Sequence, residues 1–187
     1  MVISTLSEHH EPNARVIDIF YIDDDHLYFV TFEGKPFFRE LQRNARIAIT
    51  TMGEEWIQVR MKATIKIHDK EEKERFIKQH PTLKERFMHD QLQLIEVIEG
   101  EGEAFDINGD VAFLQRGRFT FHSKTVHQAG YVITDRCVTC DSCYQHCPFD
   151  AIERGDDRYH IIPQRCNECG ICQSVCPVDA INESLGL

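Results

Sequence analysis

Residues 137–177 contain two cysteine runs, CVTCDSCYQHCP at residues 137–148 and CNECGICQSVCP at residues 166–177. Each run has the spacing C-x2-C-x2-C-x3-C-P, and together they hold all eight cysteines of the protein. The runs are 29 residues apart, and their flanks repeat as well, since residues 150–152 and 179–181 both read Asp-Ala-Ile. The stretch is therefore an internal repeat in which each half completes the other.

The spacing predicts a pair of [4Fe–4S] clusters with crossed ligands. Three cysteines at intervals of three hold one face of a cubane, and the fourth cysteine, before proline, ligates the other cluster. We predict that one cluster is held by Cys137, Cys140, Cys143 and Cys176. The second is held by Cys166, Cys169, Cys172 and Cys147.

Disulfide bonds and zinc sites are the two other common uses of eight cysteines. Four disulfides are typical of small secreted domains, which a 187-residue chain with an apparent core elsewhere does not resemble. Structural zinc sites favour paired C-x2-C knuckles, and the doubled triple followed by C-P matches these poorly. The spacing favours iron and sulfide.

The segment from Gly130 to Glu183 closely resembles the dicluster bacterial-type ferredoxins. The resemblance implies a small α+β domain, which we place at residues 130–187, with two [4Fe–4S] clusters that each carry one electron. Unpaired thiols that await clusters indicate a reducing compartment.

The charge of the chain indicates which partners to expect. The formal net charge is −10, which argues against a nucleic-acid partner because phosphates need Lys and Arg. From residue 130 onward, four arginines stand against nine acidic residues. An acidic surface of this kind suits a redox partner protein with a basic docking face, although acidity also serves solubility.

No apolar run approaches the roughly 20 residues that span a bilayer, so we expect no membrane association. The N-terminal stretch MVISTLSEHH lacks the basic start and long apolar segment of a signal peptide. We therefore expect a cytoplasmic protein.

The first 122 residues are predicted to be mainly β structure. Strands are expected at residues 2–6, 14–22, 26–32, 46–52, 56–67, 92–107 and 116–121. Residues 57–67 alternate almost without interruption between apolar and polar, which is typical of a half-buried strand with one polar face. That polar face is either solvated or directed at a cofactor or a second subunit.

Helices and turns complete this pattern. Pro36 begins a short helix that ends near Asn44, and capping boxes at Asp69 and Thr82 predict two helices separated by Pro81. Gly100 and Gly102 suggest a bulge or bend in their strand, Asn108-Gly109 a turn, and residues 123–130 a linker. The order of the strands and helices along the chain favours a small closed or partly closed β-barrel with outer helices.

A second resemblance concerns this N-terminal part. The stretches HLYFVTFEGKPFFRELQRNARIAI (26–49), WIQVRMKA (56–63) and IEVIEGEGEAFD (95–106) resemble the pyridoxamine 5′-phosphate oxidase-like FMN-binding split barrels. The resemblance implies a split-barrel domain at residues 1–125 that forms a homodimer and binds FMN between subunits. It implies phosphate contacts from Arg15, Thr31 and Lys35, and flavin contacts from Gln58 and Arg60 of the partner chain.

The sequence departs from that pattern in three ways. Lys35 lies nearer the turn than the corresponding basic residue, Ala63 occupies a position where Gly is common, and the chain continues into the cysteine runs instead of a substrate-binding segment. Vitamin B6 chemistry is therefore not predicted.

The two resemblances together imply an oxidoreductase. FMN would handle two electrons together and exchange them singly with the clusters. A small-molecule substrate is expected, and the sequence singles out no catalytic residue. The alternative is a non-enzymatic electron carrier whose barrel serves dimerisation or docking. The sequence contains no G-x-S-x-G, P-loop or G-x-G-x-x-G motif.

Overall fold

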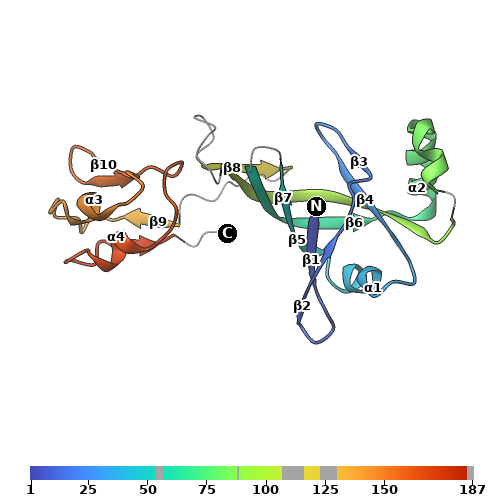
Figure 1. Cartoon of the computed structure of the whole chain (residues 1–187), viewed down its shortest axis with the longest axis horizontal. Coiled ribbons are helices and arrows are strands. Elements are labelled where there is room, and N and C mark those ends of the chain that lie inside the picture. The colour runs from blue at the N-terminus through green and yellow to red at the C-terminus, as the bar shows by residue number, and fades with distance from the viewer. Residues whose placement is uncertain (54–56, 88, 107–115, 123–129, 185–187) are drawn as a thin grey trace.

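The structure, a computed structural model, describes residues 1–53, 57–87, 89–106, 116–122 and 130–184. It contains a large β-sheet unit and a small cysteine-containing unit (Figure 1). We call residues 1–122 the sheet unit and residues 130–184 the cysteine unit. The predicted turn at Asn108-Gly109 and all but Gly130 of the linker predicted at residues 123–130 lie outside the described residues. No helix in the described ranges is long and apolar enough to cross a membrane.

Eight antiparallel strands form the sheet unit, in the order β2-β1-β5-β6-β7-β4-β3, with β8 also paired to β7. Their bounds are β1 Val2–Leu6, β2 Pro12–Val16, β3 Tyr21–Ile22, β4 Leu27–Phe32, β5 Arg46–Met52, β6 Ile57–Ile67, β7 Leu92–Asp106 and β8 Arg116–Phe121. Within the described ranges the two end strands, β2 and β3, do not pair with each other. The predicted mainly β antiparallel class is confirmed, whereas closure into a barrel is not seen in this part of the chain.

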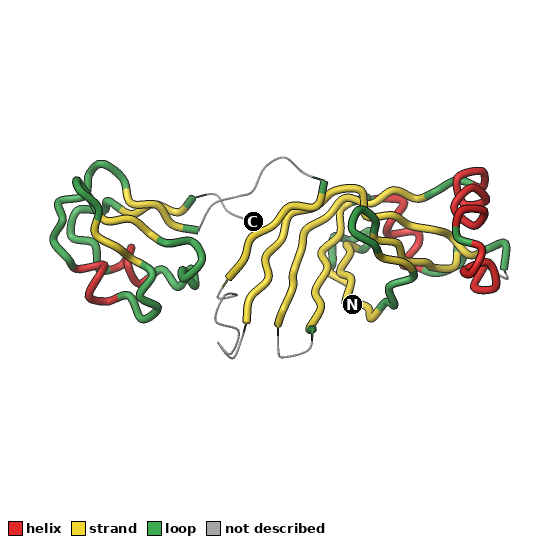
Figure 2. Tube along the Cα trace, turned by 90° about the horizontal axis from the view of Figure 1, so that it is seen from above, coloured by secondary structure: helices red, strands yellow, loops and turns green. Residues whose placement is uncertain are grey.

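Strand β7 divides the sheet into two parts. One edge of β7 pairs with β6 along nearly its whole length, while the other edge pairs first with β4 and then with β8. The register shifts between Thr64 and Ile65 of β6, which leaves Ile98 of β7 as an extra residue. The bulge marks the point at which β7 passes from β4 to β8, and Figure 2 shows the long strands leaving this region side by side.

The alternation predicted for residues 57–67 is confirmed in β6. Met61, Ala63 and Ile65 are buried in the main core, and the intervening Arg60 and Lys62 are exposed. Helix α1, Pro36–Arg43, covers the core face because Phe37 and Leu41 fall on one side of it. The other face of β4 and β7 carries a smaller aromatic core.

Helix α2, Lys70–Gln79, packs on that second face through Phe76, which contacts Phe20, Tyr28 and Leu94. The predicted capping box is present, since Asp69 and Glu72 accept hydrogen bonds from each other's backbone N–H. The second predicted helix is instead a 3-10 helix, Pro81–Phe87. The strand expected at residues 14–22 is interrupted, because residues 17–20 pair with neither neighbour as a regular ladder.

The bulge predicted for the strand of Gly100 and Gly102 is present, but it lies at Ile98. The register shift lies before them, at Thr64/Ile65, so neither glycine forms the bulge. A Cβ on Gly102 would lie 2.5 Å from the backbone oxygen of Arg60 and 2.7 Å from Phe119, and a Cβ on Gly100 would lie 2.9 Å from the backbone oxygen of Lys62. These glycines are needed because β6 and β8 approach β7 closely.

The cysteine unit is built from two similar halves. Its elements are β9 Tyr131–Ile133, α3 Ser142–His146, β10 Ile152–Arg154, β11 Tyr159–Ile161, α4 Ile171–Ser174 and β12 Ile181–Glu183. β10 pairs with β11, and β12 pairs with β9, so the two ends of the unit are joined. Ile133, Ile152, Tyr159 and Ile181 form its small core together with cysteine side chains.

Candidate iron–sulfur centres and cofactor site

The cysteine unit contains two small cavities that divide the cysteines into two sets. One cavity is lined by Cys137, Cys140, Cys143 and Cys176, which we call the first cysteine set. The other is lined by Cys166, Cys169, Cys172 and Cys147, the second cysteine set. Each set takes three cysteines from one run and the fourth from the other, which is the grouping that crossed ligation requires. All eight cysteines are free of disulfides.

Backbone amides point at the sulfur atoms in the same way in both sets. Thr139 N–H donates to Cys137 Sγ at 3.5 Å, and its repeat partner Glu168 N–H donates to Cys166 Sγ at 3.4 Å. Both residues adopt positive φ, 54° for Thr139 and 56° for Glu168. This conformation is uncommon for a β-branched residue such as Thr139, so the loop is held in the shape that turns the amide toward the thiolate.

The fourth cysteine of each set is hydrogen-bonded as well. Ala151 N–H donates to Cys147 Sγ at 3.4 Å, and Ala180 N–H donates to Cys176 Sγ at 3.2 Å. The preceding Asp150 and Asp179 again have positive φ. Amide hydrogen bonds to sulfur stabilise the electron-rich state of an iron–sulfur cluster and tune its potential. The donor set of each cavity, four thiols with two aimed amides, fits a [4Fe–4S] cluster.

Burial affects the thiols that lie deepest. It raises the pKa of Cys143, and it raises the pKa of Cys172 to about 11. Ligation needs the thiolate form, so assembly of a cluster at these positions releases protons. Cys140 and Cys169 are exposed, which leaves each cavity open at one side.

The predicted FMN contacts Arg15, Thr31 and Lys35 belong to elements that meet around α1. Lys35 is the N-cap residue of α1, and the Arg15 guanidinium lies 5.1 Å from the centre of the Phe37 ring on the same helix. Thr31 lies on β4, which contacts α1. The N-terminus of a helix attracts anions, so the place is chemically suitable for a phosphate.

Arg15, however, is already engaged. Its Nη1 and Nη2 donate to the two carboxylate oxygens of Glu40 at 2.8 and 2.9 Å. Glu40 also accepts from Thr5 and Asn13 and is only 5% exposed. Burial raises the pKa of Glu40, but the hydrogen bonds from Arg15 and Thr5 outweigh burial and lower it. Glu40, which the sequence reading missed, therefore neutralises the arginine predicted to hold phosphate.

Thr31 and Lys35 are better placed for a ligand. The hydroxyl of Thr31 is buried, with the residue 3% exposed, and no donor or acceptor in the described chain reaches it. Lys35 is exposed, and its ammonium lies 5.6 Å from the centre of the Phe32 ring. A buried hydroxyl without a partner costs free energy, and a phosphate oxygen would satisfy it. The phosphate contacts from Thr31 and Lys35 stay a prediction.

The predicted flavin contacts Gln58 and Arg60 lie on the polar side of β6. Arg60 forms an ion pair with Glu103, its direct cross-strand neighbour on β7. Gln58 is half-buried, opposite Phe105. The flavin contacts from Gln58 and Arg60 of a partner chain stay a prediction.

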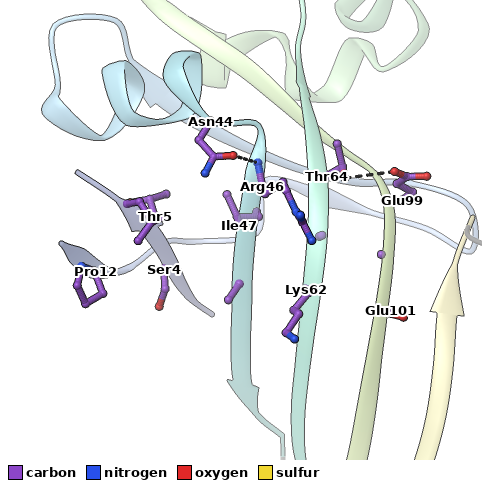
Figure 3. A pocket seen from close by; sticks show the side chains of 14 residues that line it. Ser4, Thr5, Pro12, Asn44, Arg46, Ile47, Lys62, Thr64, Glu99 and Glu101 are labelled. Atoms are coloured by element: carbon purple, nitrogen blue, oxygen red, sulfur yellow. Dashed lines mark hydrogen bonds between the residues drawn. The ribbon is translucent and has the colours of Figure 1, made fainter. Parts of the chain in front are cut away.

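Two hollows follow this side of the sheet. Figure 3 shows the larger, a groove of about 730 Å³ in which Arg46 and Lys62 extend from β5 and β6, with Thr64 hydrogen-bonded to Glu99 at 3.2 Å. None of the five predicted cofactor contacts lines this groove. The second is a cleft of about 570 Å³ that is lined by Arg60 and by residues of the cysteine unit.

The contact between the units was also missed by the sequence reading. Arg118 of β8 forms an ion pair with Glu168, which lies between Cys166 and Cys169. The one signal for it is a break in the repeat, because Glu168 occupies the position of the uncharged Thr139.

The fold and the cavities define a class of protein, an antiparallel β-sheet domain joined to a dicluster iron–sulfur domain. The chain belongs to the pyridoxamine 5′-phosphate oxidase family, whose model matches residues 1–101. The model of the 4Fe-4S dicluster domain matches residues 130–182, and the eight cysteines there support two [4Fe–4S] clusters. Both predicted resemblances are confirmed.

Individual relatives agree with this division. The 4Fe-4S ferredoxin FdxA of Gottschalkia acidurici and a ferredoxin of Acetoanaerobium sticklandii are each 52% identical over 31 residues, which is 17% of this chain and 55% of the relative. The chain thus spans about half the length of the curated relatives that it matches.

Solved structures resemble the sheet unit in fold. A NimC/NimA family protein from Clostridium acetobutylicum has a TM-score of 0.51 at 20% identity, over 64% of this chain and 81% of that one. A pyridoxamine 5′-phosphate oxidase-related, FMN binding protein from Nostoc punctiforme has a TM-score of 0.50 at 11% identity, over 66% and 80%.

Proposed function

We propose that this protein is a flavin- and iron–sulfur-dependent oxidoreductase that passes electrons between FMN in the sheet unit and two [4Fe–4S] clusters in the cysteine unit. The observation that carries the proposal is the pairing of two four-cysteine cavities with a sheet unit of the pyridoxamine 5′-phosphate oxidase family in one chain. When bound, FMN supplies two-electron chemistry, and the clusters supply single electrons.

The roles of the chain's own residues follow from their surroundings. Thr31 would donate its buried hydroxyl to a phosphate oxygen, and Lys35 would offset the phosphate charge. Arg60 and Gln58 would reach the ring system across a homodimer interface. The relative from Nostoc punctiforme is described as FMN binding, which supports the choice of flavin.

Anaerobic purification with measurement of iron, sulfide and flavin tests this function. We expect about eight iron atoms per chain from the two clusters, with one FMN released on denaturation. The variant Thr31→Val keeps the shape of the side chain and removes only the hydroxyl, so FMN affinity should fall roughly tenfold while the fold is retained. Thr51→Val on β5 is the matched control. Eight iron atoms without flavin would contradict the proposal.

A second candidate function is favoured by one observation. The Arg15 guanidinium already donates three hydrogen bonds to Glu40 and Thr5, which weakens the phosphate site. In that case the protein is a non-enzymatic electron carrier, and the sheet unit serves dimerisation or docking. Iron and sulfide in full amount with flavin below one tenth of the chain concentration would identify it.

The partners are proposed from charge. From residue 130 onward the chain carries nine acidic and four basic side chains, so we propose a one-electron redox protein with a basic docking face. A small-molecule substrate would bind beside the flavin.

A further inference from the structure

Glu168 makes three hydrogen bonds, one of which crosses from the cysteine unit to the sheet unit. Its Oε1 accepts from Arg118 on β8 and from the backbone N–H of Gly130 at 3.0 Å. Its own backbone N–H donates to Cys166 Sγ at 3.4 Å. One residue therefore links the sheet to a thiol of the second cysteine set.

The ion pair is largely withdrawn from water. The Arg118 side chain is 9% exposed and that of Glu168 is 30% exposed. Arg118 lies directly opposite Glu103 on β7, which in turn lies directly opposite Arg60 on β6. Charges of alternating sign thus cross the sheet and end at the loop of the second cysteine set. Pairs shielded in this way interact more strongly than exposed ones.

The internal repeat shows that this link is one-sided. Glu168 corresponds to Thr139 and Cys166 to Cys137, and the backbone angles and the amide–sulfur bonds match. Thr139 has no carboxylate to offer, and Cys137 is half-buried where Cys166 is buried. The two sets share the same backbone angles and amide–sulfur hydrogen bonds, but only the loop of the second set forms an ion pair with the sheet unit.

The cleft of about 570 Å³ between the two units lies beside the loop of the second cysteine set. Sheet residues including Thr50, Arg60 and Lys62 line it together with Tyr131 and Glu168 of the cysteine unit. Tyr131 also lines the cavity of the second cysteine set. The described residues that line the cavity of the first set do not include any that line the cleft. Among the described residues, Tyr131 is the one that lines both the cleft and the cavity of the second set.

We propose that Arg118 and Glu168 are positioning residues that hold the loop of the second cysteine set against the sheet. The cluster bound by Cys166, Cys169, Cys172 and Cys147 is then the inner one, and the first set faces the external redox protein. This order of clusters rests on the proposed function for its electron transfer. Two successive one-electron transfers from the external reductant, with two protons from water, would reduce one FMN.

Reduction potentials test the positioning directly, on the full chain loaded with both clusters. A nearby positive charge favours the reduced cluster, so Arg118→Gln should lower the potential of one cluster, and Glu168→Gln should raise the potential of the same cluster. The other cluster should keep its potential in both variants. Residue 118 lies in the sheet unit, so it affects a cluster only if the units are held together as the structure shows.

Hydrogen–deuterium exchange identifies which cluster is affected. Both variants should increase exchange in residues 166–170, roughly tenfold, and leave the equivalent residues 137–141 unchanged. The double variant Arg118→Gln with Glu168→Gln should show no more exchange than either single variant, because both single changes break the same ion pair. Glu153→Gln is the matched control, because it breaks the exposed ion pair with Arg165 inside the cysteine unit and should change neither segment.

Three results would overturn the proposal. They are unchanged potentials in Arg118→Gln, increased exchange in residues 137–141 rather than 166–170, and exchange in the double variant that equals the sum of the two single increases. If Arg118→Gln does not fold, Glu168→Gln alone tests the link, because it breaks the same ion pair from the cysteine unit and should raise the potential of one cluster. Neither measurement needs FMN, so a protein without flavin would defeat the proposed function and leave the cluster order to be decided separately.

Discussion

Glu40 shows how a single buried carboxylate organises the start of the sheet unit. It accepts hydrogen bonds from Arg15, Thr5 and Asn13, which brings β1, β2 and α1 together. Its removal leaves the arginine without its counter-charge. We expect Glu40→Gln to lower the free energy of unfolding of the sheet unit by about 2 kcal/mol. Urea denaturation followed by circular dichroism measures it.

The same residue predicts a pH dependence. Because the pKa of Glu40 is lowered on folding from its ordinary value of 4.5, the carboxylate contributes stability above that value, and the contribution is lost as pH falls through the lowered pKa. Glu40→Gln should therefore flatten the stability profile in this acid range. Glu8→Gln is the control, since Glu8 pairs with Arg43 but is 59% exposed. An equal loss of stability in Glu40→Gln and Glu8→Gln would contradict the role given to Glu40.

At the scale of elements, the two cysteine halves complete each other. Cys147 lines the cavity of the second set, although its nearest cysteine in the chain, Cys143, belongs to the first. We expect Cys147→Ala to reduce iron from about eight to about four atoms per chain. Alkylation with mass spectrometry should then find Cys166, Cys169 and Cys172 reactive and the first set protected. In Cys176→Ala, the first set should be reactive and the second set protected. Loss of the cluster at the first set in Cys147→Ala would refute crossed ligation.

The packing of strand β7 between β6 and β8 depends on its glycines. A Cβ at Gly102 would collide with the backbone of β6 and with Phe119 of β8, so Gly102→Ala should destabilise the sheet unit by about 2 kcal/mol. Gly34→Ala places its Cβ in open space and should change stability little. Thermal unfolding of both variants tests this, and equal melting temperatures would show that β7 can move aside.

Some of these features were predictable from the sequence and others were not. The ligand sets follow from spacing, and β6 follows from alternation, because both signals are local and strongly constrained by geometry. Glu40 and Arg118 were missed because their partners lie 25 and 50 residues away in the chain, and nothing in a local pattern marks such a pair. Gly100 and Gly102 were noticed, but the close approach that explains them is a property of the assembled sheet.

At the scale of the whole molecule, the net charge of −10 predicts the kinetics of electron exchange with proteins. Each oxidised cluster with four thiolates adds further negative charge. The reduced protein should therefore react fastest with a basic one-electron acceptor, such as a basic c-type cytochrome. Its rate should fall roughly tenfold or more as salt rises from about 0.01 M to about 1 M, because the screening length falls from about 30 to about 3 Å.

Matched variants locate this attraction on the molecule. Asp156→Asn with Asp157→Asn removes two exposed charges from the cysteine unit, and Asp24→Asn with Asp25→Asn removes two from the sheet unit. If the external protein docks on the cysteine unit, the first double variant should slow the reaction more than the second, although both change the net charge equally. Stopped-flow measurement at low salt separates them. Equal rates in the two variants would mean that the overall charge attracts the partner without directing it to the clusters.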